Sequence, residues 1–394
     1  MYLVLQTLLI TKIIILDPPA KVGGSCLAMK RFTPIVFVAF ALLSLGSCCS
    51  GDLDDNIEYS DFFENVANNM IVPRYAEFQS DLGALEMSLN AFNATDVSSL
   101  CLIQSQFKEA YLSWQYVSIF EFGPAAEYSA LLRANCNTFP ANILRIEDNI
   151  EAEEYNLAFP SNYAAKGLPA LDYLLFHSNQ TDLLIELSDS SRMLYIQDCL
   201  ADMQGKVDEV VNAWDSYRTT FVDSEGNDQN SSLSLFFNQF LYDYEKLKRD
   251  KFALPAGFAT QFGIPLDADT SVVEGRFSKM SFQLIQANLE SLENIYLGVG
   301  EDGLDGVGIF EKLKEYNAQS TVVDGDLAVA IQEQFTNCQE AISQYTNDLP
   351  FEIVHNISEV QETSNQFQKM VPMLKNDMRS YLSVTVTLTD ADGD

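Results

Sequence analysis

The sequence predicts an all-α protein made of two antiparallel helical bundles packed side by side. Two observations support this prediction. Apolar residues recur at three-to-four spacing through long windows, and the alternation typical of strands is nearly absent. A polar stretch, 223–227, is the clearest internal boundary and leaves about four or five helices on each side. Helices joined by short connections pack as antiparallel neighbours, which gives one bundle in each half.

The first half contains two long predicted helices. In residues 101–122, Trp114 and its apolar neighbours follow helical spacing until Gly123-Pro124 ends the pattern. A longer run starts near Asp189 and continues to the polar boundary. Both runs place their large apolar residues on one stripe, so we expect these stripes to form the core of the first bundle.

The second half also consists of predicted helices and ends in a different pattern. Its predicted helices cover residues 233–251, 271–297, 327–347 and 360–383. A glycine-rich stretch, 298–308, separates the second from the third. Residues 383–388 alternate between polar and apolar side chains and predict a short C-terminal strand.

The N-terminus predicts a lipid-anchored protein. Basic residues 30–31 precede an apolar run, 32–45, which is followed by Gly46-Ser47-Cys48. This order of charges, apolar run and small residues before a cysteine is typical of a lipoprotein signal segment. Diacylation of Cys48 would anchor the mature chain without a spanning helix. An uncleaved membrane helix is the alternative, but the run is short for a bilayer.

These features divide the chain into segments. Residues 1–47 form the predicted signal segment, and residues 1–28 are either an extension before a true start at Met29 or a long natural N-terminal region. Residues 48–60 form a lipidated tether. The N-terminal bundle covers 61–222 and the C-terminal bundle covers 232–394.

The formal net charge of the chain is −33, which argues against nucleic acid as a partner. Such a charge either attracts cations or simply keeps the surface solvated. Four cysteines follow the tether, and none lie at zinc-ligand spacing. They form two disulfides in one of three pairings or stay as buried free thiols: Cys101, Cys136, Cys199 and Cys338.

The most distinctive segment is GLPALDYLLF, residues 167–176. It resembles the signature of the imelysin family of bacterial cell-envelope proteins, a GxHxxE motif that precedes an apolar run. Gly167 matches the motif glycine, whereas Pro169 stands at the histidine position and Asp172 at the glutamate position. A plainer interpretation is a helix start, because proline suits the first turn of a helix.

Further segments resemble the same family and follow the family's order along the chain. Trp114 leads into Phe120-Glu121-Phe122-Gly123-Pro124, and Phe139-Pro140 follows. In the second half, 274–281 is similar to the family's ExxxS-type segment, and we place this segment on a helix. The resemblance implies a two-bundle fold with a site between the halves. The candidate ligand-binding residues are Gly167, Pro169, Asp172, Glu274, Arg276, Ser278, Glu121, Gly123 and Pro124.

The residue types available limit the chemistry of such a site. The chain has only two histidines, His177 and His355, and neither has an acidic or histidine partner at metal-ligand spacing. Asp172 and Glu274 are the candidate metal ligands. Oxygen ligands favour a hard cation such as iron or calcium. No catalytic residue is assigned.

Three functions are compatible with these observations. The leading hypothesis is a non-catalytic envelope lipoprotein that binds a cation or small ligand between its bundles, with a role in iron uptake implied by the family resemblance. The second is an imelysin-type metallopeptidase. The third is a module that docks another envelope lipoprotein or a receptor. The acidic residues after Cys48 resemble export signals of Bacteroidetes surface lipoproteins, so both faces of the outer membrane remain candidate locations.

Overall fold

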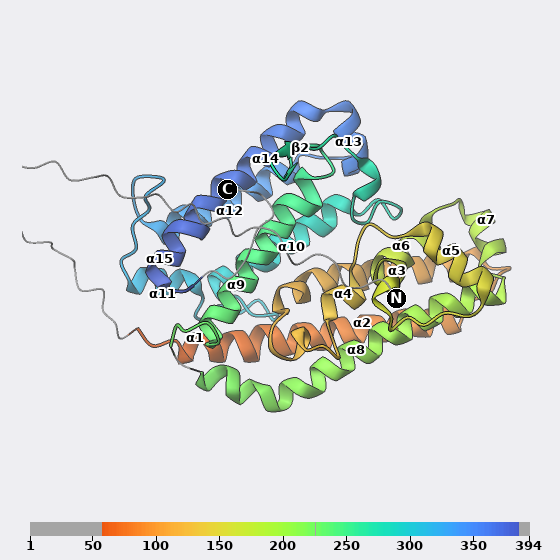
Figure 1. The fold of residues 1–394 in the computed structure, drawn as a ribbon, viewed down its shortest axis with the longest axis horizontal. Helices are drawn as coiled ribbons and strands as arrows, with labels where there is room; N and C mark the ends of the chain where they lie inside the picture. Colours follow the sequence, from red (N-terminus) through yellow and green to blue (C-terminus); the bar gives the residue numbers. More distant parts are fainter. Residues whose placement is uncertain (1–56, 225, 386–394) are drawn as a thin grey trace, which may run out of the picture. The chain divides into compact units, whose positions relative to one another are not determined.

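Helices form almost all of the regular structure in the computed structural model of the chain, which describes residues 57–224 and 226–385 (Figure 1). This confirms the predicted all-α class. The predictions for the signal segment, Cys48 and most of the tether lie outside the described residues. None of the helices within the described ranges combines the length and apolar character that crossing a bilayer requires.

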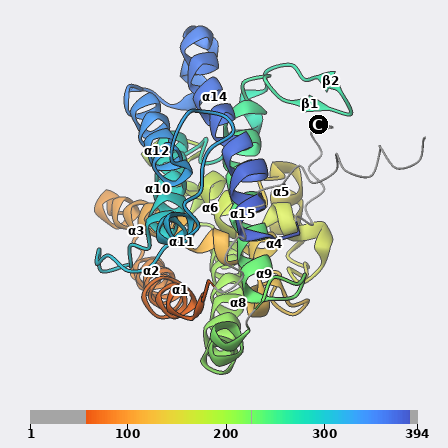
Figure 2. The same ribbon diagram turned by 90° about the vertical axis from the view of Figure 1, so that its left-hand side faces the viewer.

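The first half has two long helices packed against a third, with shorter elements around them. Its elements are α1 (Ser60–Asn65), η1 (Val66–Ile71), α2 (Val72–Asn90), α3 (Val97–Val117), η2 (Ser118–Phe120), η3 (Gly123–Ala126), α4 (Leu132–Cys136), α5 (Ile143–Ala152), η4 (Pro160–Ala165), α6 (Gly167–Phe176), α7 (Gln180–Glu186) and α8 (Ser190–Asp223). Helix α2 packs against both α3 and α8, and Figure 2 shows α2 and α8 as neighbours.

The second half has a similar set of helices and one small hairpin. Its elements are α9 (Ser232–Glu245), η5 (Lys246–Ala253), β1 (Thr260–Gln261), β2 (Ile264–Pro265), η6 (Thr270–Val272), α10 (Ser281–Leu297), α11 (Ile309–Glu315), α12 (Leu327–Ser343), α13 (Leu349–His355), α14 (Ile357–Pro372), η7 (Met373–Met378) and α15 (Arg379–Leu382). Strands β1 and β2 pair antiparallel. Helix α12 packs between α10 and α14.

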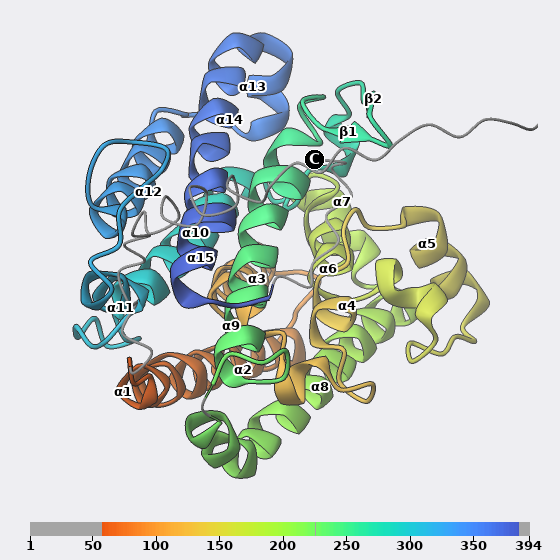
Figure 3. The same ribbon diagram turned by 60° about the vertical axis from the view of Figure 1, so that its left-hand side comes forward.

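The two halves contact each other mainly through α10, which packs along α3, and through α9, which packs against η2 (Figure 3). The apolar stripes predicted from the sequence supply the core, where Trp114 and Trp214 are almost completely buried. All described residues belong to one compact unit. The division into bundles at 61–222 and 232–394 therefore stays a prediction.

Local signals account for the ends of the longest helices. Asp189 lies at the N-terminus of α8, where its side chain accepts hydrogen bonds from the N–H groups of Ser191 and Arg192. Asp326 caps α12 in the same way through the N–H of Val329. Such caps satisfy N–H groups that have no partner inside the helix. The predicted start of α8 near Asp189 is confirmed.

The prediction that 271–297 is one helix is wrong at its N-terminal end. Helix α10 begins only at Ser281, and residues 274–279 form turns. Gly275 and Lys279 take positive φ angles of 63° and 60°, which a right-handed helix does not accept. Arg276 and Ser278 therefore lie on a loop and not on the predicted helix.

Two further expectations are settled by the described residues. Of the predicted strand at 383–388, Ser383 forms a turn with φ of 53° and 384–385 are not in a strand, while 386–388 lie outside the described residues. No disulfide joins the four cysteines after the tether: Cys136, Cys199 and Cys338 are buried free thiols and Cys101 is an exposed one. The free-thiol alternative is therefore the one observed.

Candidate functional site

Helix α6 contains the distinctive GLPALDYLLF segment and is buried along almost its whole length. Its first residue, Gly167, has a φ of 70°, and a side-chain carbon there would lie 2.3 Å from the carbonyl oxygen of Cys136. Only glycine fits this approach. Pro169 lies in the first turn of the helix, where its missing N–H costs nothing. The helix start predicted at this segment is confirmed.

Asp172 points from α6 into the second half of the protein. Its side chain is 3% exposed. Oδ2 accepts the N–H of Phe277 at 3.0 Å, and Oδ1 accepts the N–H of Ser278 at 2.9 Å. Burial raises the pKa of the Asp172 carboxyl to about 6, although the hydrogen bonds from Ser278 and Phe277 limit the rise. Both oxygens are therefore engaged within the protein.

The side chain of Glu274 extends in the opposite direction, from the second half into the first. The side chain is 2% exposed, and its Oε1 accepts hydrogen bonds from Asn137 at 2.7 Å and Gln115 at 3.3 Å. Its Oε2 lies 3.3 Å from the ammonium of Lys251, which is also buried. The same ammonium donates to Oε1 of Gln115. Tyr111 completes the network by donating to Oδ1 of Asn137 at 3.2 Å.

We call the bonds made by Asp172 and Glu274 the carboxylate clasp, because each carboxylate binds groups from the opposite half. Its members come from three helical elements, from the residue after α4 and from one loop: Asp172 on α6, Gln115 on α3, Lys251 on η5, Asn137 after α4, and Glu274, Phe277 and Ser278 on the 274–279 loop. A small cavity of about 20 Å³ adjoins the clasp, lined in part by Pro169, Asp172, Glu274 and Arg276. The structure thus brings these four predicted residues together.

The clasp does not suit a metal ion as it is arranged. Lys251 supplies the positive charge next to Glu274, and the oxygens of Asp172 are used by backbone N–H groups. Within the described part of the chain, no group of three or more His, Cys, Asp or Glu side chains is placed to hold a metal. Nε2 of His177 lies 2.9 Å from Oε2 of Glu186 and not beside Asp172.

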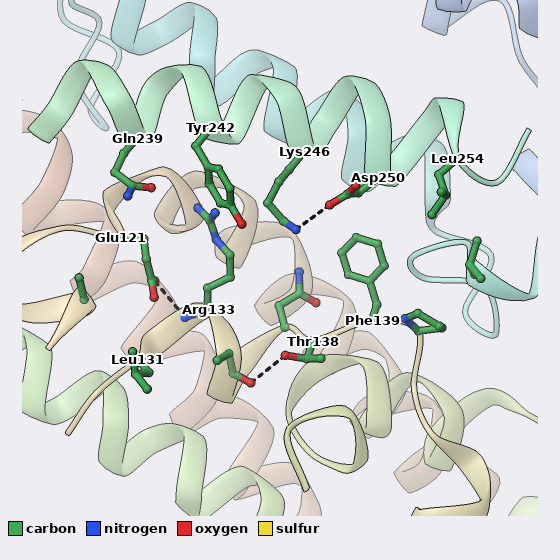
Figure 4. A pocket seen from close by; sticks show the side chains of 15 residues that line it. Glu121, Leu131, Arg133, Thr138, Phe139, Gln239, Tyr242, Lys246, Asp250 and Leu254 are labelled. Carbon is green, nitrogen blue, oxygen red and sulfur yellow. Dashed lines mark hydrogen bonds and ion pairs between the residues drawn. The ribbon is translucent and has the colours of Figure 1, made fainter. Parts of the chain in front are cut away.

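A much larger cavity, of about 650 Å³, lies beside the clasp between residues of the two halves (Figure 4). Asn137, Phe139 and Pro140 border it, and Asn137 also binds Glu274, so the two regions share a wall. The volume falls in the range of about 300–1,000 Å³ that small-molecule sites occupy. Gln239, Tyr242 and Lys246 line its other side from one face of α9 and the start of η5.

Glu121, one of the predicted ligand-binding residues, lines this large cavity. Its Oε2 accepts the backbone N–H of Arg133 at 2.9 Å. Burial raises the pKa of the Glu121 carboxyl to about 7, and the opposing effect of Arg133 only partly offsets the rise. Gly123 and Pro124 lie in η3, which packs against α8, and neither lines the two cavities.

Two residues that line the large cavity each have a polar atom that is covered by protein and lacks a hydrogen-bond partner. Arg133 donates through Nη2 to the carbonyl of Ser118 and to Oδ1 of Asp243 at 3.0 Å, but its Nη1 is buried without a hydrogen-bond partner. Oε1 of Gln239 is likewise buried without a partner. Buried polar atoms without partners are costly, so each needs an explanation.

Sequence reasoning missed the residues that partner the motif and line the cavity: Gln115, Arg133, Asn137, Gln239 and Lys251. Each lies in or beside a helical run where a polar residue is normally solvated, so nothing in the local sequence marks it. The sequence offered one weak signal. Lys251 is a cation at the end of a strongly apolar predicted helix, in an acidic chain that contains few cations. Gln115 and Asn137 lie 159 and 137 positions from Glu274, the residue that both of them bind.

Comparison with known proteins gives a family and a fold. A family model described as Imelysin, peptidase family M75, matches residues 71–378. An imelysin-like protein from Psychrobacter arcticum 273-4 superposes with a TM-score of 0.64 at 15% identity, covering 84% of this chain and 99% of that one. A candidate iron-regulated protein A precursor from Parabacteroides distasonis ATCC 8503 gives 0.65 at 15% identity, covering 82% and 94%. No curated protein matches the chain.

Proposed function

Because the chain belongs to the imelysin family, we propose that it is a cell-envelope lipoprotein that binds a small polar ligand in the large cavity and does not hydrolyse it. The proposal keeps the lipid anchor at Cys48, with the outer membrane as its location. A role in iron acquisition is supported by the resemblance and by the description of the Parabacteroides distasonis relative as iron-regulated.

The size and lining of the large cavity support ligand binding there. Its volume of about 650 Å³ falls in the range of about 300–1,000 Å³ that small-molecule sites occupy. Apolar side chains such as Phe139 and Leu254 line it together with the polar side chains of Arg133, Gln239 and Lys246. The carboxylates of the clasp, in contrast, bind groups inside the protein.

Cation binding by Asp172 and Glu274 is the competing form of this proposal. A cation there would have to displace the Lys251 ammonium and take oxygens that now accept the N–H groups of Phe277 and Ser278. Removal of one partner from a buried ion pair is strongly unfavourable. We therefore place the ligand in the large cavity. The clasp has a structural role in this proposal, because its hydrogen bonds join the two halves.

Peptidase chemistry is not part of the proposal. A zinc-activated water is normally held by nitrogen ligands, and Pro169 offers none at the motif position. His177, the nearest histidine in sequence, lies beside Glu186.

A partner lipoprotein or receptor is compatible with the same proposal, since a ligand-binding lipoprotein in the envelope would pass its ligand to another component.

The test is native mass spectrometry with elemental analysis on the full lipoprotein, purified in detergent without chelator. The expected result is a small organic adduct that Gln239→Leu diminishes, with no stoichiometric metal. A metal ion that is present at one per chain and lost in Asp172→Ala would contradict the proposal and restore the cation site.

Membrane attachment is tested separately by labelling with a fatty-acid analogue. Label in the wild-type chain and none in Cys48→Ser is expected from a lipoprotein signal. Equal labelling of the two chains would reject Cys48 as the lipidated residue, while leaving ligand binding in the cavity unaffected.

A further inference from the structure

A further cavity, of about 550 Å³, lies in the second half of the protein and shares no lining residue with the large cavity. One wall is formed by residues between 279 and 286, at the start of α10. The other is formed by residues between 342 and 351, which lead from the end of α12 into α13. We call it the α10–α13 groove. Its volume also falls in the range of about 300–1,000 Å³ that small-molecule sites occupy.

The two walls of the groove are held together by the protein itself. The rings of Phe282 and Tyr345, one from each wall, are stacked with centres 4.4 Å apart and 10° between their planes. The hydroxyl of Tyr345 hydrogen-bonds to Oγ1 of Thr363 at 2.8 Å. The N–H of Leu349 donates to Oγ of Ser281 at 2.9 Å, which joins the start of α13 to the start of α10. A site that is ordered in advance pays less entropy when it binds.

Several polar side chains that line the groove have hydrogen-bonding groups open to solvent. Gln283 and Gln286 lie three residues apart on α10 and are exposed, and their side chains bond to none of the described residues. Thr346 on the opposite wall is exposed in the same way. Asn347 donates to Oε1 of Glu352 at 2.9 Å and keeps its own carbonyl oxygen as a free acceptor. Both walls therefore offer donors and acceptors to a ligand.

The second wall also carries an exposed aromatic ring. Phe351 is 41% exposed, and its ring stacks on His355 with centres 4.1 Å apart and 18° between their planes. This stack covers only one of the two ring faces and fixes the orientation of the ring. An aromatic surface beside side-chain amides suits a molecule that has an apolar face and polar edges.

The charges of the groove favour an uncharged polar ligand. Its charged lining residues within the described part of the chain are Lys279 and Asp348, whose charges are opposite. Asp348 is already used to cap α13, through the N–H of Phe351 at 3.2 Å. The net charge of the chain, −33, disfavours anions. An apolar ligand would cover the amides of Gln283 and Gln286 without giving them partners, which is costly.

We propose that the α10–α13 groove binds a neutral saccharide, with the apolar face of a sugar ring on Phe351 and the sugar hydroxyls on Gln283 and Gln286. Sugar rings have C–H groups on their faces, and each hydroxyl is a donor and an acceptor at once. Side-chain amides match hydroxyls because one end donates and the other accepts. The inference does not depend on the proposed function, because the groove and the large cavity share no lining residue.

The test is calorimetric titration of the full lipoprotein, kept in a detergent that has no sugar headgroup. The neutral probes are cellohexaose, maltohexaose and the hexamer of N-acetylglucosamine. A hexamer of galacturonate is the acidic probe, and the uncharged peptide acetyl-Gly-Ser-Gln-Ser-Gly-amide represents a different class of ligand. The expected result is binding of at least one neutral saccharide, and binding of the acidic probe and the peptide that is weaker by about tenfold or more.

Variants then locate the bound saccharide. Phe351→Ala removes the exposed ring and should weaken binding of the best neutral probe by about tenfold or more, whereas Phe351→Tyr keeps a ring and should change it by less than about threefold. Gln283→Leu should weaken binding about three- to tenfold. The matched controls are Tyr128→Ala and Gln368→Leu, because both residues are exposed and lie outside the groove, so neither change should affect binding.

Three results would overturn this inference. The first is that no neutral saccharide binds. The second is unchanged binding in both Phe351→Ala and Gln283→Leu, which would place the saccharide elsewhere on the protein. The third is that the acidic probe or the peptide binds more tightly than every neutral saccharide. The proposed function would survive all three results, because it is tested by the organic adduct of the large cavity in native mass spectrometry.

Discussion

The carboxylate clasp and the large cavity share a wall but differ in the space that they leave for a ligand. In the clasp, Asp172 and Glu274 are almost completely buried, bind partners from the opposite half and adjoin a cavity of only about 20 Å³. In the large cavity, Arg133, Gln239 and Lys246 line a space of about 650 Å³ together with apolar side chains. Polar groups with internal partners stabilise a fold, whereas a space of this size with a mixed lining can hold a small molecule. The family motif therefore marks the join between the halves, and the large cavity is the candidate binding site.

The largest expected effect is on the buried ion pair of the clasp. Glu274→Ala leaves the Lys251 ammonium buried without its counter-charge, so we expect the free energy of unfolding to fall by about 3–5 kcal/mol. Urea unfolding monitored by circular dichroism measures the change. The double variant with Glu274→Gln and Lys251→Met should recover much of the loss, because no buried charge remains. A loss below about 0.5 kcal/mol in the single variant would show that the pair is not buried in solution.

A smaller loss is expected at the other carboxylate. Asp172→Ala removes the acceptor for the N–H groups of Phe277 and Ser278, which should lower the free energy of unfolding by about 2–4 kcal/mol. Asp172→Asn retains one acceptor oxygen and should lose about half as much. Equal losses in the two variants would mean that charge, and not the loss of an acceptor, controls the contact. Faster hydrogen exchange is expected at both Phe277 and Ser278 in the alanine variant, and at only one of the two in the asparagine variant.

The pH dependence of stability should report Glu121 on the cavity side. Its pKa is about 7 in the folded protein and 4.5 as the ordinary value, so the native state holds the proton more tightly than the unfolded chain. The resulting stabilisation is complete below about pH 4.5 and is lost as the pH rises through about 7. We expect the stability difference between wild type and Glu121→Gln to change by on the order of 2 kcal/mol across this window. Parallel pH profiles of the two proteins would place Glu121 in contact with water.

The smallest loss of stability is expected at Gln239, whose buried acceptor has no partner. Gln239→Leu removes that acceptor, so the free energy of unfolding should not fall and should rise by up to about 1–3 kcal/mol. Gln115→Leu removes a residue that binds Glu274 and Lys251 and should cost about 1–3 kcal/mol. Thermal unfolding of both glutamine variants tests the contrast directly. Equal losses would erase the distinction between clasp and cavity.

Local sequence patterns predicted the helices well because helical periodicity and caps act over a few residues. The start of α8 at Asp189 and the helix start at Gly167-Leu168-Pro169 follow from such signals. The 274–279 loop was mistaken for helix because its polar composition resembles a first turn. Lys279 has a left-handed backbone conformation but is not a glycine, so the sequence did not indicate that the helix is interrupted there.

The candidate site could be predicted only in part. The sequence by itself determined the all-helical fold class. It also determined which groups the candidate site has available, namely the carboxylates of Asp172 and Glu274 and no histidine at the motif. Tertiary structure decided what these carboxylates do, because their partners lie far along the chain: Phe277 is 105 positions from Asp172, and Gln115 is 159 positions from Glu274. Only the packing of the two halves brings Gln115 and Asn137 to Glu274. Periodicity is a local property of the chain, whereas the burial and pairing of charges depend on the whole fold.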